Sequence, residues 1–286
     1  MALRKARARL NDKDIAQDED FLPAERRAKI MDWFSANSVA STQDLARRLN
    51  ASISTIRRDL DLLASEGLLK RTHGGAVRTR QNTTYEQRTE EAKNTSVEEK
   101  RAIAKAAASI LQPGQSVLID SKSTSHHLAH AIAELGIPLT VITNDVQVAA
   151  ILANKDPISV VVPGGSCRHG AYVLLGETST KFVRELNCDH FFLCTHAVDT
   201  TGPTDTSLDL VQLQRAMVNA AMETTLIIDS SKFGSRKIYS VVPIEQIKRI
   251  ITDEGLAEED REKYSALVDD LVIAPFLEDF LSQSED

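Results

Sequence analysis

The feature that most constrains this chain is a helical pattern between Ser52 and Leu63 whose two faces differ in chemistry. Apolar residues recur at spacings of three and four, namely Ile53, Ile56, Leu60 and Leu63. This is the spacing of one buried helix face. Ser52 has the side chain of an N-cap, and Gly67 is typical of the residue just past a helix end. The sequence therefore predicts a helix over residues 52–66 with one face in a core.

The residues on either side supply the rest of a small helical domain. Pro23 suits a first helical turn, so a helix is expected to start there. Ser41 and Asp44 have the spacing of a capping box and predict a second, short helix. A basic hairpin follows the third helix, with a Gly74-Gly75 turn that lets the backbone approach another group closely. Three helices and a hairpin are the pattern of a winged helix-turn-helix domain, here residues 21–78.

The polar face of the 52–66 helix has the chemistry of a DNA-reading surface. Arg57 and Arg58 lie off the apolar stripe, and an exposed arginine pair can reach guanine edges or phosphates. Hydroxyls at a helix N-terminus meet phosphate together with unpaired N–H groups. The alternative, a solvated charged face, is disfavoured by the capped three-helix setting and the basic wing. The predicted contacts to double-stranded operator DNA are Ser41, Thr42, Ser52, Ser54, Thr55, Arg57, Arg58, Lys70, Arg71, His73 and Gly74.

Charge is divided unevenly along the chain. Residues 1–80 hold 16 Lys and Arg against 11 Asp and Glu, whereas residues 81–286 hold 18 against 30. The total of −7 alone would argue against a nucleic-acid partner, but the asymmetry indicates a basic module on an acidic carrier. The charged residues 1–20 are expected to form a flexible tail. Residues 79–98 are expected to be a linker, and residues 99–286 a domain for effector binding and oligomerisation.

The composition favours a cytoplasmic protein without a cofactor or metal. No run of about 18 apolar residues predicts a membrane span, and the basic N-terminus lacks the apolar segment of a secretory signal. Cys167, Cys188 and Cys194 have spacings that suit neither a zinc site nor a disulfide framework. We expect them to be buried, reduced thiols.

From about residue 97 onward, short apolar strands alternate with helices. The expected helices are residues 101–111, 124–135 and 146–153, and the expected strands are 117–119, 139–143, 158–162, 191–193, 226–228 and 250–251. Such alternation predicts an α/β domain with a mostly parallel sheet and helices on both faces. Ligands of such sheets bind in the loops that follow the carboxyl ends of the strands.

Three of these loops carry groups that suit an anion. Residues 120–125 follow a strand and open a helix, so hydroxyls and N–H groups gather at a helix N-terminus. Residues 229–232 place Lys232 after another strand, and residues 162–165 end in two glycines that permit backbone contact with a ligand. Each signal is weak alone, because polar loops are common. Three on one sheet edge indicate one polar, anionic ligand.

The stretch Thr55-Ile56-Arg57-Arg58-Asp59-Leu60, followed by His73-Gly74-Gly75-Ala76, resembles the signature of the DeoR family of bacterial sugar-catabolism regulators, which are usually repressors. The resemblance extends from about residue 22 to residue 253. Asn50 and Ala51 depart from residues common in the family, without consequence for the fold. Two such modules in a symmetric homodimer or homotetramer would read a repeated or palindromic site.

The second half resembles the DeoR effector domain, which is similar to ribose-5-phosphate isomerase. This resemblance implies a phosphorylated sugar or related anion as inducer. The hydroxyl residues of the 120–125 loop match the phosphate loop, and Lys232 matches the lysine that meets the phosphate in that fold. The predicted effector-binding residues are Asp120, Ser121, Lys122, Ser123, Thr124, Ser125, Thr143, Asn144, Gly164, Gly165, His196, Asp199, Asp205 and Lys232.

Two departures from the pattern bear on function. Lys122 stands where the family loop commonly has glycine, and it could add a cation for a strongly anionic ligand or equally point to solvent. The acid-rich isomerase segment corresponds to residues 193–197, here Leu-Cys-Thr-His-Ala. The carboxylates needed for proton transfer between sugar carbons are therefore missing. This counts against the alternative of an isomerase-like enzyme with a DNA-binding arm.

A third possibility is a metal site at His126 and His130, which are four residues apart on a predicted helix, a spacing used for zinc. No nearby cysteine or carboxylate completes a ligand set, so a structural role is expected instead. The sequence therefore predicts a regulator rather than an enzyme. We expect a repressor of a carbohydrate-catabolism operon, controlled by a phosphorylated sugar or related anion.

Overall fold

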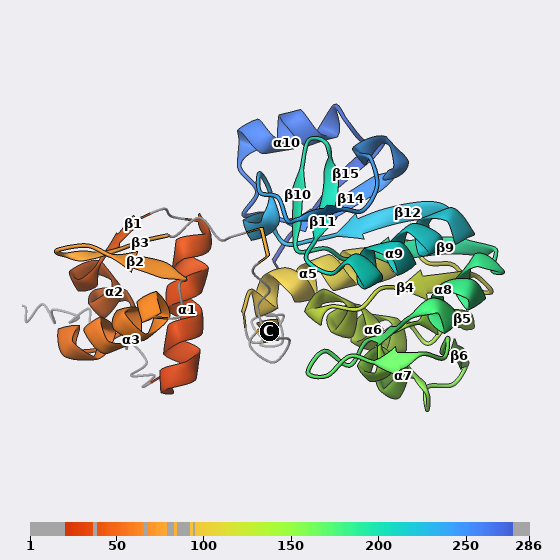
Figure 1. Cartoon of the computed structure of the whole chain (residues 1–286), viewed down its shortest axis with the longest axis horizontal. Coiled ribbons are helices and arrows are strands. Elements are labelled where there is room, and N and C mark those ends of the chain that lie inside the picture. Colours follow the sequence, from red (N-terminus) through yellow and green to blue (C-terminus); the bar gives the residue numbers. More distant parts are fainter. Residues whose placement is uncertain are drawn as a thin grey trace, which may run out of the picture.

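The fold consists of two units with separate cores (Figure 1). The computed structural model describes residues 21–36, 39–65, 68–78, 83–84, 92–93 and 95–276. The predicted tail, Gly67 and much of the predicted linker lie outside these residues. The predicted fold class is confirmed, because a winged helix-turn-helix unit precedes an α/β unit built on a parallel sheet.

The N-terminal unit contains three helices and a three-stranded sheet. The helices are α1 (Pro23–Ala36), α2 (Thr42–Arg48) and α3 (Ile53–Ser65), and the strands are β1 (Val39–Ser41), β2 (Leu69–Arg71) and β3 (Gly75–Arg78). The predicted caps are confirmed. The Oγ atom of Ser41 accepts the N–H of Asp44 at 3.0 Å, and that of Ser52 accepts the N–H of Thr55 at 3.1 Å. One such cap stabilises a helix by about 1 kcal/mol.

One small core joins the three helices. Its main residues are Ile30, Phe34, Leu45, Ile56, Leu60 and Leu63. Ile53 does not belong to it, although the sequence pattern placed it in the apolar stripe, and its exposed fraction is 43%. Ile53 is the first residue of α3 and precedes Ile56 by almost a turn, so the core ends before reaching it.

Strand β1, which the sequence did not predict, completes an antiparallel sheet in the order β1–β3–β2. The backbones of β1 and β3 approach closely where Ser41 pairs with Gly75. A Cβ atom on Gly75 would lie 1.9 Å from the carbonyl oxygen of Ala40, whereas one on Gly74 would have no atom within 4 Å. Close packing of β1 on β3 therefore requires glycine at position 75. The close backbone approach expected at Gly74-Gly75 is made by Gly75 to β1 of the same unit.

The C-terminal unit is built on a seven-stranded sheet in the order β15–β14–β12–β9–β4–β5–β6, in which every neighbouring pair is parallel. The strands are β4 (Ser116–Ile119), β5 (Leu139–Thr143), β6 (Ile158–Val161), β9 (Cys188–Leu193), β12 (Ala221–Ile227), β14 (Arg249–Asp253) and β15 (Asp270–Ala274). The sequence predicted all of them except β15. Parallel strands place the loops after their carboxyl ends along one edge of the sheet.

Helices cover both faces of this sheet, as predicted. Helices α5 (Val97–Ala108), α6 (Ser123–Leu135) and α7 (Val146–Leu152) pack on one face, and α8 (Glu177–Arg184) and α9 (Leu208–Ala220) on the other (Figure 1). The C-terminal unit has a hydrophobic core on each face of the sheet, and alternate residues of β4 belong to one core or the other. Val117 and Ile119 face the α5–α6 side, whereas Leu118 faces the α9 side.

Smaller elements complete the unit. These are β7 (Ser166–Cys167) paired with β8 (Leu174–Leu175), the sheet β10 (Ala197–Asp199), β11 (Gly202–Asp205) and β13 (Tyr239–Ser240), the 3₁₀ turns η1 (Ser230–Lys232) and η2 (Ile244–Gln246), and helix α10 (Glu258–Ser265). Cys188 and Cys194 are buried as predicted. The prediction was wrong for Cys167, which is exposed because β7 belongs to a two-stranded ribbon outside the main sheet.

The described residues include no helix that is long and apolar enough to cross a membrane. Nor do they bring together three His, Cys, Asp or Glu side chains that could hold a metal ion.

The backbone approach at Gly75 generates a stability prediction. The Gly75→Ala variant is expected to destabilise the N-terminal unit, because the new methyl group would overlap the carbonyl oxygen of Ala40. The Gly74→Ala variant is the matched control, since the added methyl group meets no atom there. Calorimetric unfolding of the full chain measures both. An unchanged transition in Gly75→Ala would show that β1 is not held against β3.

The buried ring of His190 generates a pH prediction. Its Nε2 atom lies 3.0 Å from the Thr225 hydroxyl, and burial lowers its pKa from 6.5 to about 4. As the pH falls from 6.5 to 4, the unfolded chain takes up a proton that the folded chain does not, so stability is lost. The loss is at most about 3 kcal/mol.

Urea unfolding of the full chain at pH 7 and pH 5 checks this prediction. The His190→Gln variant should lose less stability on acidification than the wild type, because the titrating group is gone. His130→Gln, which changes an exposed histidine of α6, should retain the wild-type dependence. An equal loss of unfolding free energy between pH 7 and pH 5 in all three proteins would contradict the prediction.

Candidate functional site

Helix α3 presents a polar, cationic face. Ser52, Ser54, Arg57 and Arg58 are exposed, and Thr55 is half-buried. The Ser52 hydroxyl lies 2.8 Å from those of both Ser54 and Thr55, so the three form a cluster at the helix N-terminus. Within the described part of the chain, no acidic side chain forms an ion pair with Arg57 or Arg58. Both guanidinium groups are therefore available to an anionic partner.

Asp59, the next residue, has the opposite orientation. It is 5% exposed, and its Oδ2 atom accepts a hydrogen bond from Arg26 Nε at 2.6 Å. Arg27 lies 3.7 Å from Oδ1. These contacts tie α3 to α1 and set the rotation of α3 about its axis, so that Arg57 and Arg58 face outward. Asp59 belongs to the Thr55–Leu60 motif, but nothing in the local sequence pattern indicated this role.

The wing residues differ in how accessible they are. Lys70, His73 and Gly74 are exposed. Arg71 instead donates to Asp61 of α3 at 2.7 Å and to the carbonyl of Gly75 at 2.6 Å, so it braces the wing against the helix.

The other two predicted DNA contacts lie on α2 and its cap. Ser41 uses its hydroxyl as the N-cap of α2. Thr42 is only 5% exposed, which does not fit its predicted contact with DNA, because its side chain points into the unit.

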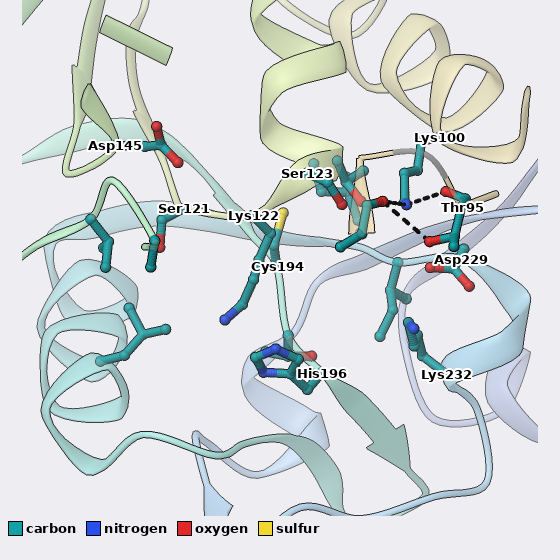
Figure 2. A pocket seen from close by; sticks show the side chains of 18 of the residues that line it. Thr95, Lys100, Ser121, Lys122, Ser123, Asp145, Cys194, His196, Asp229 and Lys232 are labelled. Carbon is teal, nitrogen blue, oxygen red and sulfur yellow. Dashed lines mark hydrogen bonds between the residues drawn. The ribbon is translucent and has the colours of Figure 1, made fainter. Parts of the chain in front are cut away.

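A pocket lies at the carboxyl edge of the large sheet, where the loops after β4, β9 and β12 meet. Figure 2 shows its side chains. Six of the predicted effector-binding residues line it, namely Ser121, Lys122, Ser123, Thr124, His196 and Lys232. Ser121 and Lys122 precede α6, and Ser123 and Thr124 begin it. Unpaired N–H groups at such a helix N-terminus favour an anion.

Four other predicted residues lie behind the pocket wall. Asp120, Ser125, Thr143 and Asn144 are fully buried. Asp120 accepts hydrogen bonds from the N–H groups of Ser121 and Cys194 and from the amide of Gln214. It thereby joins the loops after β4 and β9 to α9. Burial raises the pKa of Asp120 to about 6, against the opposing effect of Lys122. Its contribution is to position the loops.

Three predictions were wrong about the pocket lining. Gly164 and Gly165 follow the edge strand β6 and pack against α8. The Ser179 hydroxyl donates to the carbonyl of Gly164, and a Cβ atom on Gly165 would lie 2.4 Å from that hydroxyl. Asp199 ends β10 and forms an ion pair with Arg236 at 2.8 Å, outside the pocket.

Lys122 and His196 meet at the buried carboxylate of Asp205. His196 Nδ1 lies 2.9 Å from Asp205 Oδ1, and Lys122 Nζ lies 3.3 Å from Oδ2. Burial by itself would raise the pKa of Asp205, but Lys122 and His196 outweigh it and hold the pKa below its usual value. The side chain of Lys122 is 19% exposed. Of the two alternatives left open by the sequence, the structure therefore excludes the one in which Lys122 points to solvent.

Sequence reasoning missed four charged pocket residues, namely Lys100, Asp145, Arg168 and Lys237, and it gave no role to Asp229 of the 229–232 loop. Lys100 lies on the buried face of α5 and is 4% exposed. Its Nζ atom donates to the carbonyls of Ala92, at 2.7 Å, and Thr95, in the predicted linker (Figure 2). A lysine on the apolar face of an alanine-rich helix was the signal that could have identified it.

The histidines of α6 have separate roles. His126 Nε2 lies 3.0 Å from Asp145 Oδ2, so this ring orients a pocket carboxylate. His127 has its pKa lowered to about 4 by burial and by the neighbouring Lys100 and Arg101, and His130 is exposed.

The model of the DeoR-like helix-turn-helix domain matches residues 26–82, and that of the DeoR C terminal sensor domain matches residues 95–254. The HTH-type transcriptional regulator GlpR of Haloferax volcanii is 36% identical over 246 residues, covering 85% of this chain and 94% of its own. The L-fucose operon activator of Haemophilus influenzae is 32% identical over 234 residues, covering 80% and 91%.

Among solved structures, ribose 5 phosphate isomerase A from Neisseria gonorrhoeae is similar to 48% of this chain and 53% of its own, with a TM-score of 0.36 and 16% identity. This partial likeness supports no conclusion about activity. The two family models together cover both units, and the regulators align over most of their own length. The chain therefore belongs to the DeoR family of transcriptional regulators.

Proposed function

We propose that this protein represses a carbohydrate-catabolism operon and that a phosphorylated sugar or related anion bound in the C-terminal pocket controls its hold on DNA. Two copies in a symmetric oligomer would set two α3 helices in successive major grooves. Arg57 and Arg58 would contact bases or phosphates, and Lys70 and His73 of the wing would hold the backbone. The observation that carries the DNA-binding part is the exposed arginine pair without an acidic partner among the described residues.

The pocket supports an anionic effector. Five lysine and arginine side chains line it against two aspartates, Asp145 and Asp229. It also contains the N-terminal turn of α6, a helix of 13 residues, whose unpaired N–H groups add positive potential. A phosphate group on the effector would satisfy both, and the hydroxyl side chains of Ser121, Ser123 and Thr124 can hydrogen-bond its oxygens.

The predicted linker contacts the rim of this pocket at two places. The carbonyl of Thr83 accepts the N–H of Ile238 at 3.2 Å, next to the pocket residue Lys237. The carbonyls of Ala92 and Thr95 accept from Lys100. An anion that draws Lys100 toward itself would weaken the bonds to the linker. The effector would then have a different affinity for the protein when the linker is bonded to Lys100 and when it is not. Control by a ligand requires such a difference in affinity between two states.

The alternative function, an isomerase-like enzyme, is disfavoured by the state of the carboxylate beside the pocket residue His196. Asp205 lies beside His196, but Lys122 holds its pKa low. A carboxylate with a strongly lowered pKa is a poor general base, because catalysis needs a pKa near the working pH. Turnover of pentose or hexose phosphates by the purified protein would support the enzyme hypothesis instead.

The exposed arginines generate a DNA-binding prediction. The Arg58→Ala variant should lose specific binding to the promoter region, with a drop of about 1–3 kcal/mol in discrimination against random DNA. Arg184→Ala, which changes an exposed arginine of α8 in the other unit, is the matched control. Fluorescence anisotropy titrations at two salt concentrations measure both. Unchanged promoter preference in Arg58→Ala would refute the assignment of α3 as the reading helix.

The Lys100 contacts generate a prediction about control. In the wild type, a sugar phosphate that raises the melting temperature by mass action should weaken promoter binding. In Lys100→Met the same ligand should change promoter affinity far less, because the bonds between α5 and the linker are absent from the start. Lys105→Met, an exposed position on the same helix, should keep wild-type control. Tighter promoter binding with ligand in the wild type would contradict the proposed release of DNA by the effector.

A further inference from the structure

Ile53 is an exposed apolar side chain on the helix that carries the arginine pair. Its exposed fraction is 43%, and it belongs neither to the core of the N-terminal unit nor to the partly buried residues that pack against that core. Single exposed apolar residues are common on protein surfaces and need no explanation by themselves. The position of Ile53 on α3, however, places it beside the groups on which the proposed DNA binding depends.

Ile53 lies in the first turn of α3, on the same side as one of the two arginines. It is the first residue of the helix and follows the capping residue Ser52. Arg57 comes four residues later, and residues with this spacing are neighbours on a helix surface. The recognition helix of a helix-turn-helix protein contacts base edges with its N-terminal residues. An α3 helix set in the major groove would therefore bring Ile53 to the bases together with Arg57.

The chemistry of the isoleucine side chain limits which part of a base it can contact favourably. It has no hydrogen-bond donor or acceptor. Covering a polar base edge with it would remove water from that edge without replacing the lost hydrogen bonds, which costs free energy. In the major groove, the edges of adenine, guanine and cytosine present donors and acceptors, whereas thymine also presents its C5-methyl group. The thymine methyl group is thus the base feature that matches Ile53.

We propose that Ile53 reads a thymine in each operator half-site by packing against its C5-methyl group. This inference rests on the proposed function, because it concerns the same DNA-binding helix. Side chains four residues apart on a helix are separated by about 5–6 Å, and successive bases of one strand by about 3.4 Å. The thymine is therefore expected within about two base pairs of the group that Arg57 contacts. Phosphate contacts carry no sequence information, so Ile53 becomes a residue that determines operator specificity.

Binding of the full-length protein to its own promoter region tests the inference, with one thymine at a time replaced by deoxyuridine. This replacement removes the methyl group and leaves the hydrogen-bonding groups of the base in place. For the wild type, one position in each half-site should show about four-fold weaker binding, the effect of leaving one methyl-sized apolar group unburied. Replacement in both half-sites should weaken binding by about sixteen-fold, because the free energies of distant contacts add.

Two variants of α3 assign the effect to one side chain. Ile53→Ala should bind the thymine duplex about as weakly as the wild type binds the deoxyuridine duplex, and the replacement should then have no further effect at that position. Leu62→Ala is the matched control, because Leu62 is a similarly exposed apolar residue, 42% exposed, near the other end of the helix. It should retain the wild-type difference between the two duplexes. Fluorescence anisotropy titrations measure all of these affinities.

Two results would overturn the inference and leave the proposed function standing. One is a wild type that prefers its promoter region but is insensitive to every thymine replacement. The other is an Ile53→Ala variant with the same sensitivity to the replacements as the wild type. A wild type that shows no preference for the promoter region over random DNA would overturn the proposed DNA binding itself, and the inference with it.

Discussion

The candidate effector site depends on the buried carboxylate of Asp120. It lies directly after β4, and it accepts N–H groups from its own loop and from the loop after β9, as well as the amide of Gln214 on α9. Burying a carboxylate is costly unless hydrogen bonds compensate for lost water, and here three donors offset part of that cost, since burial still raises the pKa of Asp120 to about 6. The same bonds join two neighbouring strand ends and a helix from the opposite face. The side chains of Ser121, Lys122 and His196 then project from a rigid edge.

A buried aspartate plays the same part in the N-terminal unit. Asp59 belongs to α3 but turns inward to Arg26, and this pairing orients the helix. The arginines before it then have no acidic partner within the described residues and face outward. In both units an internal ion pair or hydrogen-bond network positions the cations that are left for an external anion. Breaking such a buried pair costs about 3–5 kcal/mol, because a charge is left uncompensated.

In the proposed function, the predicted linker connects the effector pocket to the DNA-binding unit. Thr83, Ala92 and Thr95 contact residues at the rim of the pocket, and Lys100 is both a pocket residue and a donor to the linker. Under the proposed function, this one side chain would link the effector directly to the linker. Such a link would need no rearrangement of the sheet, since only the hydrogen bonds of one ammonium group would change. Lys122 has a different environment, because its ion pair is with the buried Asp205 rather than with the linker.

The sequence by itself determined the elements and the chemistry of both surfaces. The periodicity of Ile56, Leu60 and Leu63 and the hydroxyl caps are local, so α3 and its polar face could be predicted, as could six of the seven parallel strands. Tertiary structure decided which residues share a site. Gly165 and Asp199 lie at strand ends, as the pocket-lining residues do, but they contact other parts of the protein. Gly165 packs against Ser179 of α8, and Asp199 forms an ion pair with Arg236. Lys100 and Arg168 enter the pocket from segments outside the predicted loops. Local patterns show what a residue can do, but its partners are set by contacts between segments distant in the chain, which only the folded arrangement determines.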